Sequence, residues 1–598
     1  MTPTDTSTAG TTAAAEAPRT HEDRSADTPV VLSVEGLDIS YRSRSGDLLA
    51  AVEGVSLQVR AARTTAVVGE SGSGKSSTAS AVIGLLARNA VTGSGRILLG
   101  DRDLATLTPG EWRAVRGARI GYIPQDPGNS LNPLKTIGAS VAESLRIHRK
   151  ADTQQARARV LELLDRVGID RPELRADQYP HELSGGMRQR VLIAAAIALE
   201  PDLIIADEPT SALDVTVQKR ILDLLDDLRA EGAGILFITH DLAVAAERAD
   251  ELVVMQGGKV VESGPAVQVF TQPESDYTRR LLADAPSLVD LTTHGTGSHG
   301  AGPRAATAAA DGRPAEGARG QGASAADPAP TLLEVSGLTQ VYGRAANGDV
   351  IGLEDVGFSV PEGTTHGIVG ESGSGKSTLG KILTGFLDPQ AGTARIGDFD
   401  AAALPRGGSL FGGAARRERK AFHKAVQLVH QNPYSALDPA HSIASTLTEP
   451  LRNFRLGTRT DRARAVREAM DRVALPARLL TRRPRELSGG QLQRVAIARA
   501  LIIEPRLVVL DEAVSALDVT VQAQILRLLD DLQQELGLTY VFISHDLAVV
   551  RQIADTVSVL SKGRQVEAGP TARVYSDPQE DYTKRLLAAI PRPTTREK

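Results

Sequence analysis

The octapeptide GESGSGKS occurs twice in this chain, at residues 69–76 and again at residues 370–377, which is 301 positions later. Each copy fits the phosphate-loop pattern G-x-x-x-x-G-K-[ST] and follows a short apolar stretch that is typical of a strand. The glycines let backbone N–H groups curl around a phosphate chain, and the following helix adds the positive end of its dipole. The lysine reaches the outer phosphates, and the next hydroxyl can hold Mg²⁺. Two identical octapeptides in matching contexts therefore indicate two nucleotide sites.

The residues of each loop that we expect to contact nucleotide are its glycines, its hydroxyls and its lysine. In the first copy these residues are Gly69, Ser71, Gly72, Gly74, Lys75, Ser76 and Ser77. In the second copy they are Gly370, Ser372, Gly373, Gly375, Lys376, Ser377 and Thr378. Of these, Ser76 and Ser377 are also the expected Mg²⁺ ligands.

The segments that follow each loop repeat in the same order. A glutamine comes first (Gln125, Gln431), then Leu-Ser-Gly-Gly at residues 183–186 and 487–490. An apolar run that ends in Asp-Glu follows, then Ser-Ala-Leu-Asp, and last a histidine. The serine of Leu-Ser-Gly-Gly precedes the first acid by 23 residues in both halves. A repeat of about 300 residues is too long for a solenoid unit, so it indicates duplication of a whole domain.

Composition narrows the function classes. The 598 residues, 41% hydrophobic and 24% charged, are those of a globular protein of several domains. The net charge of -5 argues against a nucleic-acid partner gripped by a basic surface. With no cysteine there is no disulfide, thiolate metal site or cysteine-held iron–sulfur cluster, which fits a cytosolic location. No apolar run reaches the roughly 18 residues that a membrane span needs, and the first residues lack the apolar core of a secretory signal.

Composition also places the domain boundaries. Residues 1–28 are Thr/Ala-rich and polar, so we expect a disordered N-terminal segment, and residues 286–330 predict a flexible Ala/Gly-rich linker. In the two domains between and beyond, residues 29–285 and 331–598, short β-branched runs alternate with longer helical stretches. That alternation predicts an α/β fold with crossover helices. The segment between the glutamine and Leu-Ser-Gly-Gly predicts an inserted helical subdomain in each domain.

The ordered set of phosphate loop, glutamine, Leu-Ser-Gly-Gly, Asp-Glu, Ser-Ala-Leu-Asp and histidine resembles the ATP-binding cassette (ABC) ATPases. The resemblance covers roughly residues 30–285 and 331–592. It implies two P-loop domains, each with a RecA-like core, an antiparallel β subdomain and a helical subdomain. It also implies hydrolysis of ATP with Mg²⁺ as cofactor. Both halves keep every motif, so two competent hydrolytic sites are expected.

A narrower resemblance lies in the sequence QDP at residues 125–127 with SLNP at 130–133, matched by QNPYSALDP at 431–439. With the tails DYTRRLL at 276–282 and DYTKRLL at 581–587, these segments are similar to the dipeptide, oligopeptide and nickel importer branch. The resemblance implies a peripheral ATPase on the cytoplasmic face of the cell membrane that powers peptide import. Its implied partners are two transmembrane permease subunits and an extracytoplasmic substrate-binding protein. Nickel or glutathione import stays open, because other proteins choose the substrate.

By the same resemblance the two cassettes close head-to-tail, and each ATP lies between one phosphate loop and the Leu-Ser-Gly-Gly of the other half. Lys75 is then paired with Ser488, and Lys376 with Ser184. The γ-phosphate contacts implied in this way are Ser184, Gly185, Gly186, Ser488, Gly489, Gly490, His240 and His545. The implied water-activating residues are Glu208 and Glu512, and the implied Mg²⁺ ligands are Asp207, Asp511, Gln125 and Gln431.

Simpler interpretations exist for single residues. An acidic pair after a strand is often a helix N-cap, and a lone histidine is often a satisfied core or surface group. Recurrence of all the motifs in order, twice, favours the catalytic interpretation. Tyr41 and Tyr342, each 28 residues before a phosphate loop, are expected to stack on adenine, with core packing as the alternative.

One rival class shares the twin-cassette pattern. Ribosome-associated translation factors of the same superfamily also carry two cassettes without membrane spans. They would show a long charged helical linker, whereas residues 286–330 are rich in Ala and Gly. DNA-repair and chromosome-organising relatives need zinc cysteines or long coiled coils, which this sequence lacks.

Overall fold

The structure is a computed structural model, which describes residues 28–43, 45–210, 213, 215–285, 330–344, 349–404, 414–515 and 517–591. The predicted N-terminal segment and the predicted linker lie outside the described residues, apart from their edge residues 28 and 330. The positions of the domain boundaries therefore stay predictions.

Each half contains a six-stranded, mostly parallel sheet that is buried on both faces. The order in the first half is β11 (Lys259–Pro265), β10 (Glu251–Gln256), β3 (Thr64–Val68), β9 (Gly234–Ile238), β8 (Leu203–Asp207) and β7 (Ile120–Ile123). The order in the second half is β17 (Val426–Val429), β18 (Leu507–Asp511), β19 (Thr539–Ile543), β14 (Thr365–Val369), β20 (Thr556–Ser561) and β21 (Arg564–Pro570). Within these two sheets, only the edge strands β11 and β21 pair antiparallel with their neighbours.

Alternation along the strands explains this double burial. In β9, Ile235 and Phe237 join one hydrophobic cluster, while Leu236 and Ile238 join the cluster on the opposite face. All five residues of β9 are buried, which is the pattern of a parallel strand covered on both sides. The apolar runs before the phosphate loops, the acidic pairs and the histidines are thus central strands, whereas the strands before Gln125 and Gln431, β7 and β17, lie at an edge of each sheet.

An antiparallel sheet packs against each core sheet. In the first half it contains β2 (Leu48–Arg60), β1 (Val30–Arg42), β5 (Arg96–Leu99) and β6 (Arg102–Asp103), with β4 (Ala90–Thr92) paired to β1. In the second half it contains β13 (Val350–Pro361), β12 (Thr331–Arg344), β15 (Ala391–Ile396) and β16 (Phe399–Asp400).

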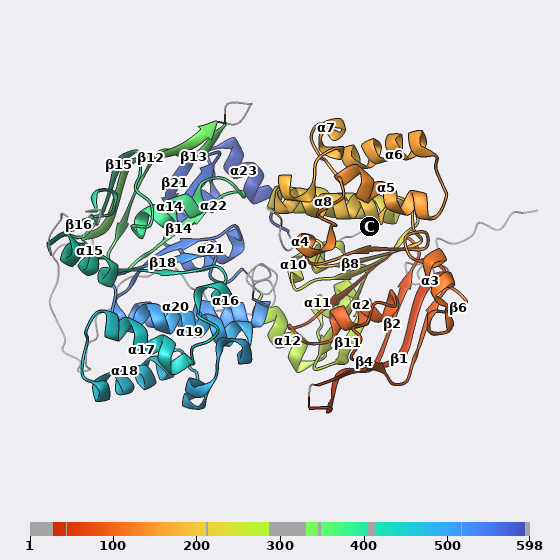
Figure 1. Ribbon diagram of the computed structural model, residues 1–598, viewed down its shortest axis with the longest axis horizontal. Coiled ribbons are helices and arrows are strands. Elements are labelled where there is room, and N and C mark those ends of the chain that lie inside the picture. Colours follow the sequence, from red (N-terminus) through yellow and green to blue (C-terminus); the bar gives the residue numbers. More distant parts are fainter. Residues whose placement is uncertain are drawn as a thin grey trace, which may run out of the picture.

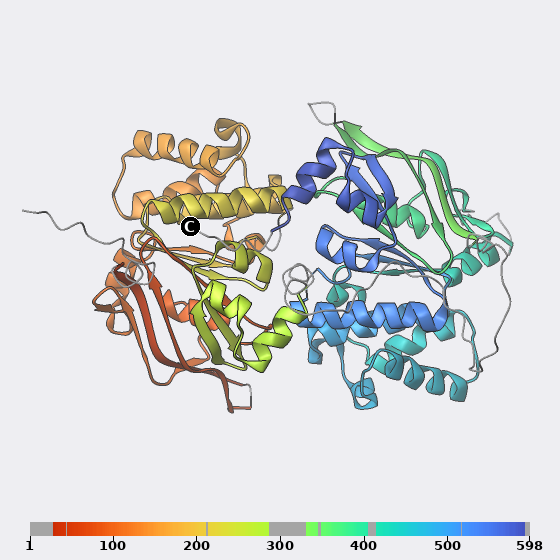
Figure 2. The ribbon, with the colours of Figure 1, turned by 180° about the vertical axis from the view of Figure 1, so that it is seen from behind.

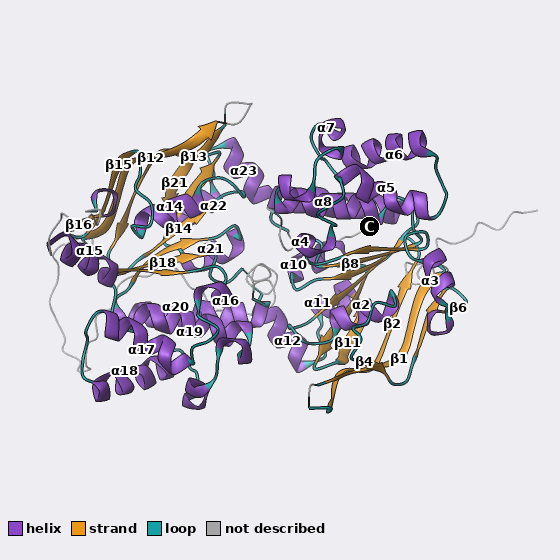
Figure 3. Cartoon of the chain, in the orientation of Figure 1, coloured by secondary structure: helices purple, strands orange, loops and turns teal. Residues whose placement is uncertain are grey.

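A helical subdomain is inserted after each glutamine, as the sequence predicts (Figure 3). The helices of the first half are α2 (Lys75–Val82), α3 (Pro109–Val115), α4 (Pro127–Ser130), α5 (Ile137–Ile147), α6 (Thr153–Arg166), α7 (Pro172–Ala176), α8 (Gly185–Ala196), α9 (Val215–Ala230), α10 (Leu242–Arg248), α11 (Ala266–Thr271) and α12 (Asp276–Ala283). Those of the second half are α14 (Lys376–Leu383), α15 (Ala414–Ala425), α16 (Pro433–Ala436), α17 (Ile443–Asn453), α18 (Arg459–Arg472), α19 (Gly489–Leu501), α20 (Val519–Leu536), α21 (Leu547–Ile553), α22 (Thr571–Ser576) and α23 (Asp581–Ala588). The spacing of Val160, Leu161, Leu163, Leu164 and Val167 predicts one apolar helical face here; four of these residues are buried, and Leu161 is partly buried against the same cluster.

The two halves lie side by side, and the last described helix of each half, α12 or α23, extends toward the other half (Figure 1). Helix α12 of the first half ends beside α20, where Asp284 pairs with Arg527. Helix α23 reaches the first half in the same way, as the view from behind also shows (Figure 2). Across the described part of the chain, no helix combines the length and the apolarity that a membrane span requires.

Candidate active sites

Each phosphate loop connects a buried central strand to a helix. The loop of residues 69–76 leads from β3 into α2, and Gly74 caps that helix with a φ of 98° in the left-handed region. A Cβ there would lie 2.6 Å from the carbonyl oxygen of Ala51, so only glycine fits. The helix end has no side-chain cap, which leaves its N–H groups directed at the place where a phosphate would bind.

The lysine of each loop is folded back onto its own loop. Nζ of Lys75 donates to the carbonyl oxygens of Gly69 (2.6 Å) and Glu70 (2.8 Å). Nζ of Lys376 makes the matching bonds at 2.7 and 2.9 Å. Lys75 is only 7% exposed, and this burial lowers the pKa of its ammonium group. The lysine is therefore a desolvated cation held by weak carbonyl partners, which a phosphate can replace.

The register of the core sheet brings the acidic pair to the phosphate loop. Strands β3, β9 and β8 are adjacent and parallel, and Asp207, the last residue of β8, pairs with Ile238 of β9. The hydroxyl of Ser76 donates to Oδ1 of Asp207 at 3.2 Å. Burial raises the pKa of Asp207 to about 6, although the bond from Ser76 lowers it. In the second half, burial likewise raises the pKa of Asp511.

Each glutamate that follows the aspartate is held by two partners. Nε2 of Gln125 donates to Oε2 of Glu208 at 2.7 Å, and Nδ1 of His240 lies 3.1 Å from Oε1. In the second half the Gln431–Glu512 bond is 2.6 Å, and Nδ1 of His545 lies 3.4 Å from Oε1 of the same carboxylate. The sequence-predicted glutamine, glutamate and histidine are thus brought together in both halves.

Electrostatics favour the charged form of each pair. Burial on its own would raise the pKa of Glu208, but the hydrogen bond and charge of His240 outweigh it and hold that pKa below its usual value. Burial would lower the pKa of His240, but Glu208 raises it instead. Each partner thus favours the charged form of the other, and the lowered pKa of Glu208 favours the basic carboxylate that proton abstraction from water requires.

Backbone geometry marks the same two glutamates. Glu208 and Glu512 have φ values of 47° and 48°, in the left-handed region that non-glycine residues avoid. This strain costs about 1–3 kcal/mol at such a position and persists only where the surrounding structure fixes it. The N–H groups of both glutamates donate at 2.9 Å to the last residue of the neighbouring strand, Ile238 or Ile543.

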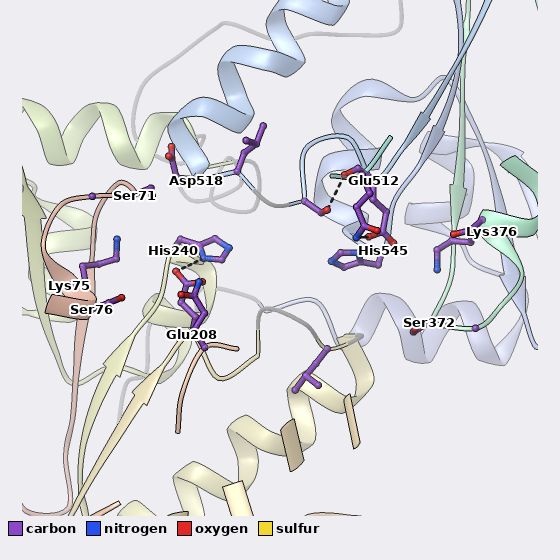
Figure 4. A pocket seen from close by; sticks show the side chains of 18 of the residues that line it. Ser71, Lys75, Ser76, Glu208, His240, Ser372, Lys376, Glu512, Asp518 and His545 are labelled. Atoms are coloured by element: carbon purple, nitrogen blue, oxygen red, sulfur yellow. Dashed lines mark hydrogen bonds and ion pairs between the residues drawn. The ribbon is translucent and has the colours of Figure 1, made fainter. Parts of the chain in front are cut away.

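One cavity of about 1020 Å³ joins the sites of the two halves. In Figure 4 the two Glu–His pairs lie between Lys75 and Lys376. The predicted residues on its wall are Ser71, Gly72, Gly74, Lys75, Ser76, Ser77, Gln125, Glu208, His240, Tyr342, Ser372, Gly373, Gly375, Lys376, Ser377, Thr378, Gln431, Glu512 and His545. The cavity is large enough for nucleotide, and it is lined by both halves.

Some predicted residues do not form part of this wall. Among the described residues, those absent from the lining are Gly69, Gly370, Asp207, Asp511, Tyr41, Ser184, Gly185, Gly186, Ser488, Gly489 and Gly490. The serines Ser184 and Ser488 instead cap helices α8 and α19. The predicted pairing of each phosphate loop with the opposite Leu-Ser-Gly-Gly stays a prediction. The hydroxyl of Tyr41 donates to Ser77 at 3.1 Å, whereas Tyr342 is exposed on the cavity wall.

The sequence interpretation gave no role to the repeated Ser-Ala-Leu-Asp tetrapeptide, but three residues of its second copy line the cavity. Ser515, Leu517 and Asp518 belong to the repeated Ser-Ala-Leu-Asp of the second half, and Asp518 lines the same cavity as Ser71 of the first phosphate loop (Figure 4). The negative charge of Asp518 also acts on Lys75 across the interface. The identical repetition of this tetrapeptide in the two halves was the sequence signal that could have indicated a functional role. Of its first copy, only Leu213 belongs to the described residues, and it lines the cavity too.

Comparison with known proteins agrees with this geometry. The model of the family described as ABC transporter matches residues 52–211 and 353–515, and the chain belongs to that family. The model described as oligopeptide/dipeptide transporter, C-terminal region, matches residues 566–598. The predicted class, an ATP-hydrolysing protein with two ABC cassettes in one chain, is confirmed.

Three relatives show the branch of the family. The chain is 40% identical to the glutathione import ATP-binding protein GsiA of Salmonella choleraesuis, over 94% of this chain and 89% of the relative. It is 41% identical to the peptidoglycan transport ATP-binding protein YejF of Agrobacterium fabrum, over 94% and 96%. It is 40% identical to the oligopeptide transport ATP-binding protein OppD of Mycobacterium bovis, over 94% and 98%. The predicted resemblance to the peptide-importer branch is confirmed.

Proposed function

We propose that this chain is the ATPase subunit of an importer for dipeptides or oligopeptides, and that it hydrolyses ATP at two composite sites. The observation that carries the proposal is the matched Gln–Glu–His set in each half, placed with its phosphate loop on one shared cavity. Both halves hold every group that phosphoryl transfer to water needs, namely charge neutralisation, positioning and a base. Neither site is degenerate in these groups.

The residues of each site divide the chemistry between them. When a phosphate binds, Lys75 exchanges its bonds to the loop carbonyls of Gly69 and Glu70 for phosphate oxygens. Glu208 accepts a proton from the attacking water once Gln125 releases Oε2. His240 stays on Oε1 and fixes the direction of the carboxylate. The second half repeats these roles with Lys376, Glu512, Gln431 and His545.

The donor set fits Mg²⁺. Ser76 and Asp207 offer two oxygen ligands at the phosphate loop, and Gln125 adds an amide oxygen nearby. Mg²⁺ prefers oxygen and is usually held by one or two protein groups, phosphates and waters. Phosphate oxygens and waters would supply the remaining ligands of the ion. Bound there, Mg²⁺ neutralises charge on the phosphates.

Closure of the two halves completes the proposed cycle. The caps of α8 and α19 present helix N-termini, whose positive ends suit a γ-phosphate. Binding of two ATP molecules would bring each of these ends onto the opposite phosphate loop. Hydrolysis removes the γ-phosphate contacts and releases the closed state, as in other nucleotide switches.

The proposed partners are two transmembrane permease subunits and an extracytoplasmic binding protein, with the chain docked on the cytoplasmic face. Support for a docking groove comes from a cavity of about 320 Å³ between the core and the helical subdomain of the second half. Its wall includes His430, which precedes Gln431, together with Phe454 and Phe386, the last of which is 65% exposed. This groove, whose wall carries both polar and apolar side chains, lies beside the glutamine and would connect the permease to the catalytic carboxylate.

The proposed transported substrate, a peptide, rests on the relatives in this branch of the family. The relatives named for glutathione, peptidoglycan and oligopeptide transport are 40, 41 and 40% identical, so identity does not rank them. Glutathione is itself a tripeptide, and a peptide substrate covers these relatives best. Nickel is the remaining alternative from the branch.

The test is capture of the tagged chain from detergent-solubilised membranes, followed by mass spectrometry of the proteins that come with it. We expect two multi-span permeases. The complex is then placed in vesicles with its binding protein, and ATP turnover is measured with dipeptides, longer peptides, glutathione or Ni²⁺. Stimulation by peptides supports the proposal. Capture of ribosomal proteins without a permease would contradict it and favour the translation-factor alternative.

A further inference from the structure

Two tyrosines that the catalytic cycle does not use contact the phosphate loops. The hydroxyl of Tyr277 accepts the N–H of Glu70 at 3.2 Å, and the hydroxyl of Tyr582 accepts the N–H of Glu371 at 3.3 Å. Both glutamates are the second residue of their loops, and both tyrosines belong to the repeated Asp-Tyr-Thr of the C-terminal helices. Tyr277 is only 6% exposed. Each loop is therefore tied by its backbone to the last helix of its own half.

The start of each of these helices is itself fixed. The carboxylate of Glu262, on β11, accepts the N–H groups of Glu274 and Ser275 at 2.8 and 3.0 Å. In the second half Glu567, on β21, accepts those of Gln579 and Glu580 at 2.9 and 3.2 Å. A helix held in this way at its start cannot shift its tyrosine without breaking these hydrogen bonds.

The same two helices end on the opposite half. After α12, Asp284 pairs with Arg527 of α20 at 2.5 Å, and Ala285 shares a buried cluster with Val519 at the start of that helix. After α23, Ile590 and Pro591 line a cavity together with Leu222 of α9. Figures 1 and 2 agree on these two crossings. Each C-terminal helix thus joins its own phosphate loop to the long helix α9 or α20 of the other half.

A second bond crosses the interface at one loop. The hydroxyl of Thr216, in the first turn of α9, donates to Oε1 of Glu371 at 2.6 Å. The matching residue of α20 is Thr520, and among the described residues its buried hydroxyl has no hydrogen-bond partner. Helix α9 therefore contacts the second half at two places. Thr216 in its first turn bonds to Glu371, and Leu222 lines a cavity with the residues that follow α23, the helix that carries Tyr582.

We propose that Thr216 and Tyr582 are positioning residues for the second phosphate loop, and that α9 of the first half supports that loop from across the interface. Glu371 is held at its backbone by its own half and at its carboxylate by the other half. ATP binding at Lys376 therefore depends on the position of α9 of the first half relative to the second phosphate loop. Binding at Lys75 depends on this contact less, because the hydroxyl of Thr520 makes no matching bond.

The experiment compares matched pairs of variants in the full chain. Thr216→Val removes the crossing hydroxyl, and Thr520→Val is its control at the equivalent position. Tyr582→Phe removes the phenol oxygen, and Tyr575→Phe is its control, because the Tyr575 hydroxyl donates at 2.7 Å to the carbonyl of Leu547, which is not a residue of the phosphate loop. ATP binding to each half is read by cross-linking with 8-azido-ATP at increasing concentration, and mass spectrometry assigns the label to the first or the second half.

We expect Thr216→Val and Tyr582→Phe to raise the half-saturating concentration of the second half by about three- to tenfold, the range for loss of one hydrogen bond. Labelling of the first half should not change, and both control variants should match the wild type. Equal effects of Thr216→Val and Thr520→Val, or equal effects of the two tyrosine variants, would overturn the inference. The assay measures ATP binding alone, so its result does not depend on which substrate the importer carries. An error in the proposed substrate is therefore distinguishable from an error in the proposed role of Thr216 and Tyr582.

Discussion

Glu208 and Glu512 share one backbone conformation, and each is held by a glutamine and a histidine, but the residues around them differ between the two halves. Thr65 lies on the strand before the first phosphate loop, and its hydroxyl donates to the carbonyl of Gln58. At the matching place in the second half, His366 is buried against Phe358. The comparison teaches that duplication kept the groups that act on phosphate and let their supports diverge.

The supports at the interface diverge in the same way. The carboxylate of Glu371 accepts a bond from the other half, and the hydroxyl of Tyr41 is bonded to Ser77 whereas Tyr342 lies exposed at the cavity. We therefore expect equal chemistry at the two sites and unequal binding of ATP.

The largest effect is expected from the glutamates. Glu208→Gln and Glu512→Gln each remove a base, so hydrolysis at the altered site should fall by about 10²- to 10⁴-fold while ATP still binds. Because the chemistry is matched, the two single variants should keep similar residual turnover, which is lost in the double variant. The measurement is steady-state phosphate release. Full activity in Glu512→Gln would show that this carboxylate is not the base.

The serines that cap α8 and α19 test the head-to-tail pairing. Ser488→Arg removes an N-cap and places a cation at the positive end of a helix, so the site it completes should lose about tenfold or more in turnover. We expect the loss at the site of Lys75, in the other half, and Ser184→Arg should impair the site of Lys376. Vanadate trapping of labelled nucleotide in each half measures this. A loss at the site of the same half would contradict the pairing.

His366 should make the second half sensitive to acid. Burial lowers the pKa of His366 to about 3, and its ring nitrogens lie 2.8 and 3.0 Å from the hydroxyls of Thr556 and Ser558. The unfolded chain binds a proton near pH 6.5 and the folded chain does not, so stability falls as pH drops below 6.5, by about 1.4 kcal/mol per pH unit. Above that pH the histidine is neutral in both states and contributes no pH dependence.

Hydrogen exchange of β14 and β20, followed by mass spectrometry between pH 7 and 5, measures this loss after correction for the intrinsic exchange rate. His366→Thr, which carries the residue of the first half, is the matched variant and should show a flatter pH dependence. The same pH dependence in the variant and the wild type would contradict the role of His366.

The smallest effect concerns a helix cap that only one half completes. The side chain of Gln491 accepts the N–H of Ser488 at 3.2 Å and completes a capping box, whereas the first half has Met187 at that place. Met187→Gln should stabilise α8, and Gln491→Met should destabilise α19, each by about 0.5–1 kcal/mol. Denaturant unfolding of the two variants measures the change. Opposite signs are required, and equal signs would contradict the account.

The sequence was sufficient to predict the functional groups that lie in short, ordered motifs. The phosphate loops, the acidic pairs and the histidines follow central strands, so their meeting at one edge of the sheet could be predicted from Lys75, Glu208 and His240. The glutamine came from the family resemblance, and the structure places Gln125 on Glu208. The two α/β domains and their helical subdomains were predictable for the same reason, since alternating apolar runs determine them.

The remaining features depend on contacts that no local pattern encodes. The bond from Thr216 to Glu371 joins residues 155 positions apart, and the different environments of Tyr41 and Tyr342 arise from packing around identical residue types. The folding of Lys75 onto its own loop reflects competition among buried partners and could not be read from the octapeptide. Sequence repetition identified the groups, and the three-dimensional interface decided which of them differ.

The most direct test of two competent sites is the number of nucleotides bound when hydrolysis is stopped. Native mass spectrometry of the Glu208→Gln/Glu512→Gln chain with Mg²⁺ and ATP counts the molecules of ATP per chain. Two ATP molecules per chain are predicted, with the second half losing its ATP first as the concentration is lowered in Thr216→Val. A maximum of one ATP per chain would contradict the account.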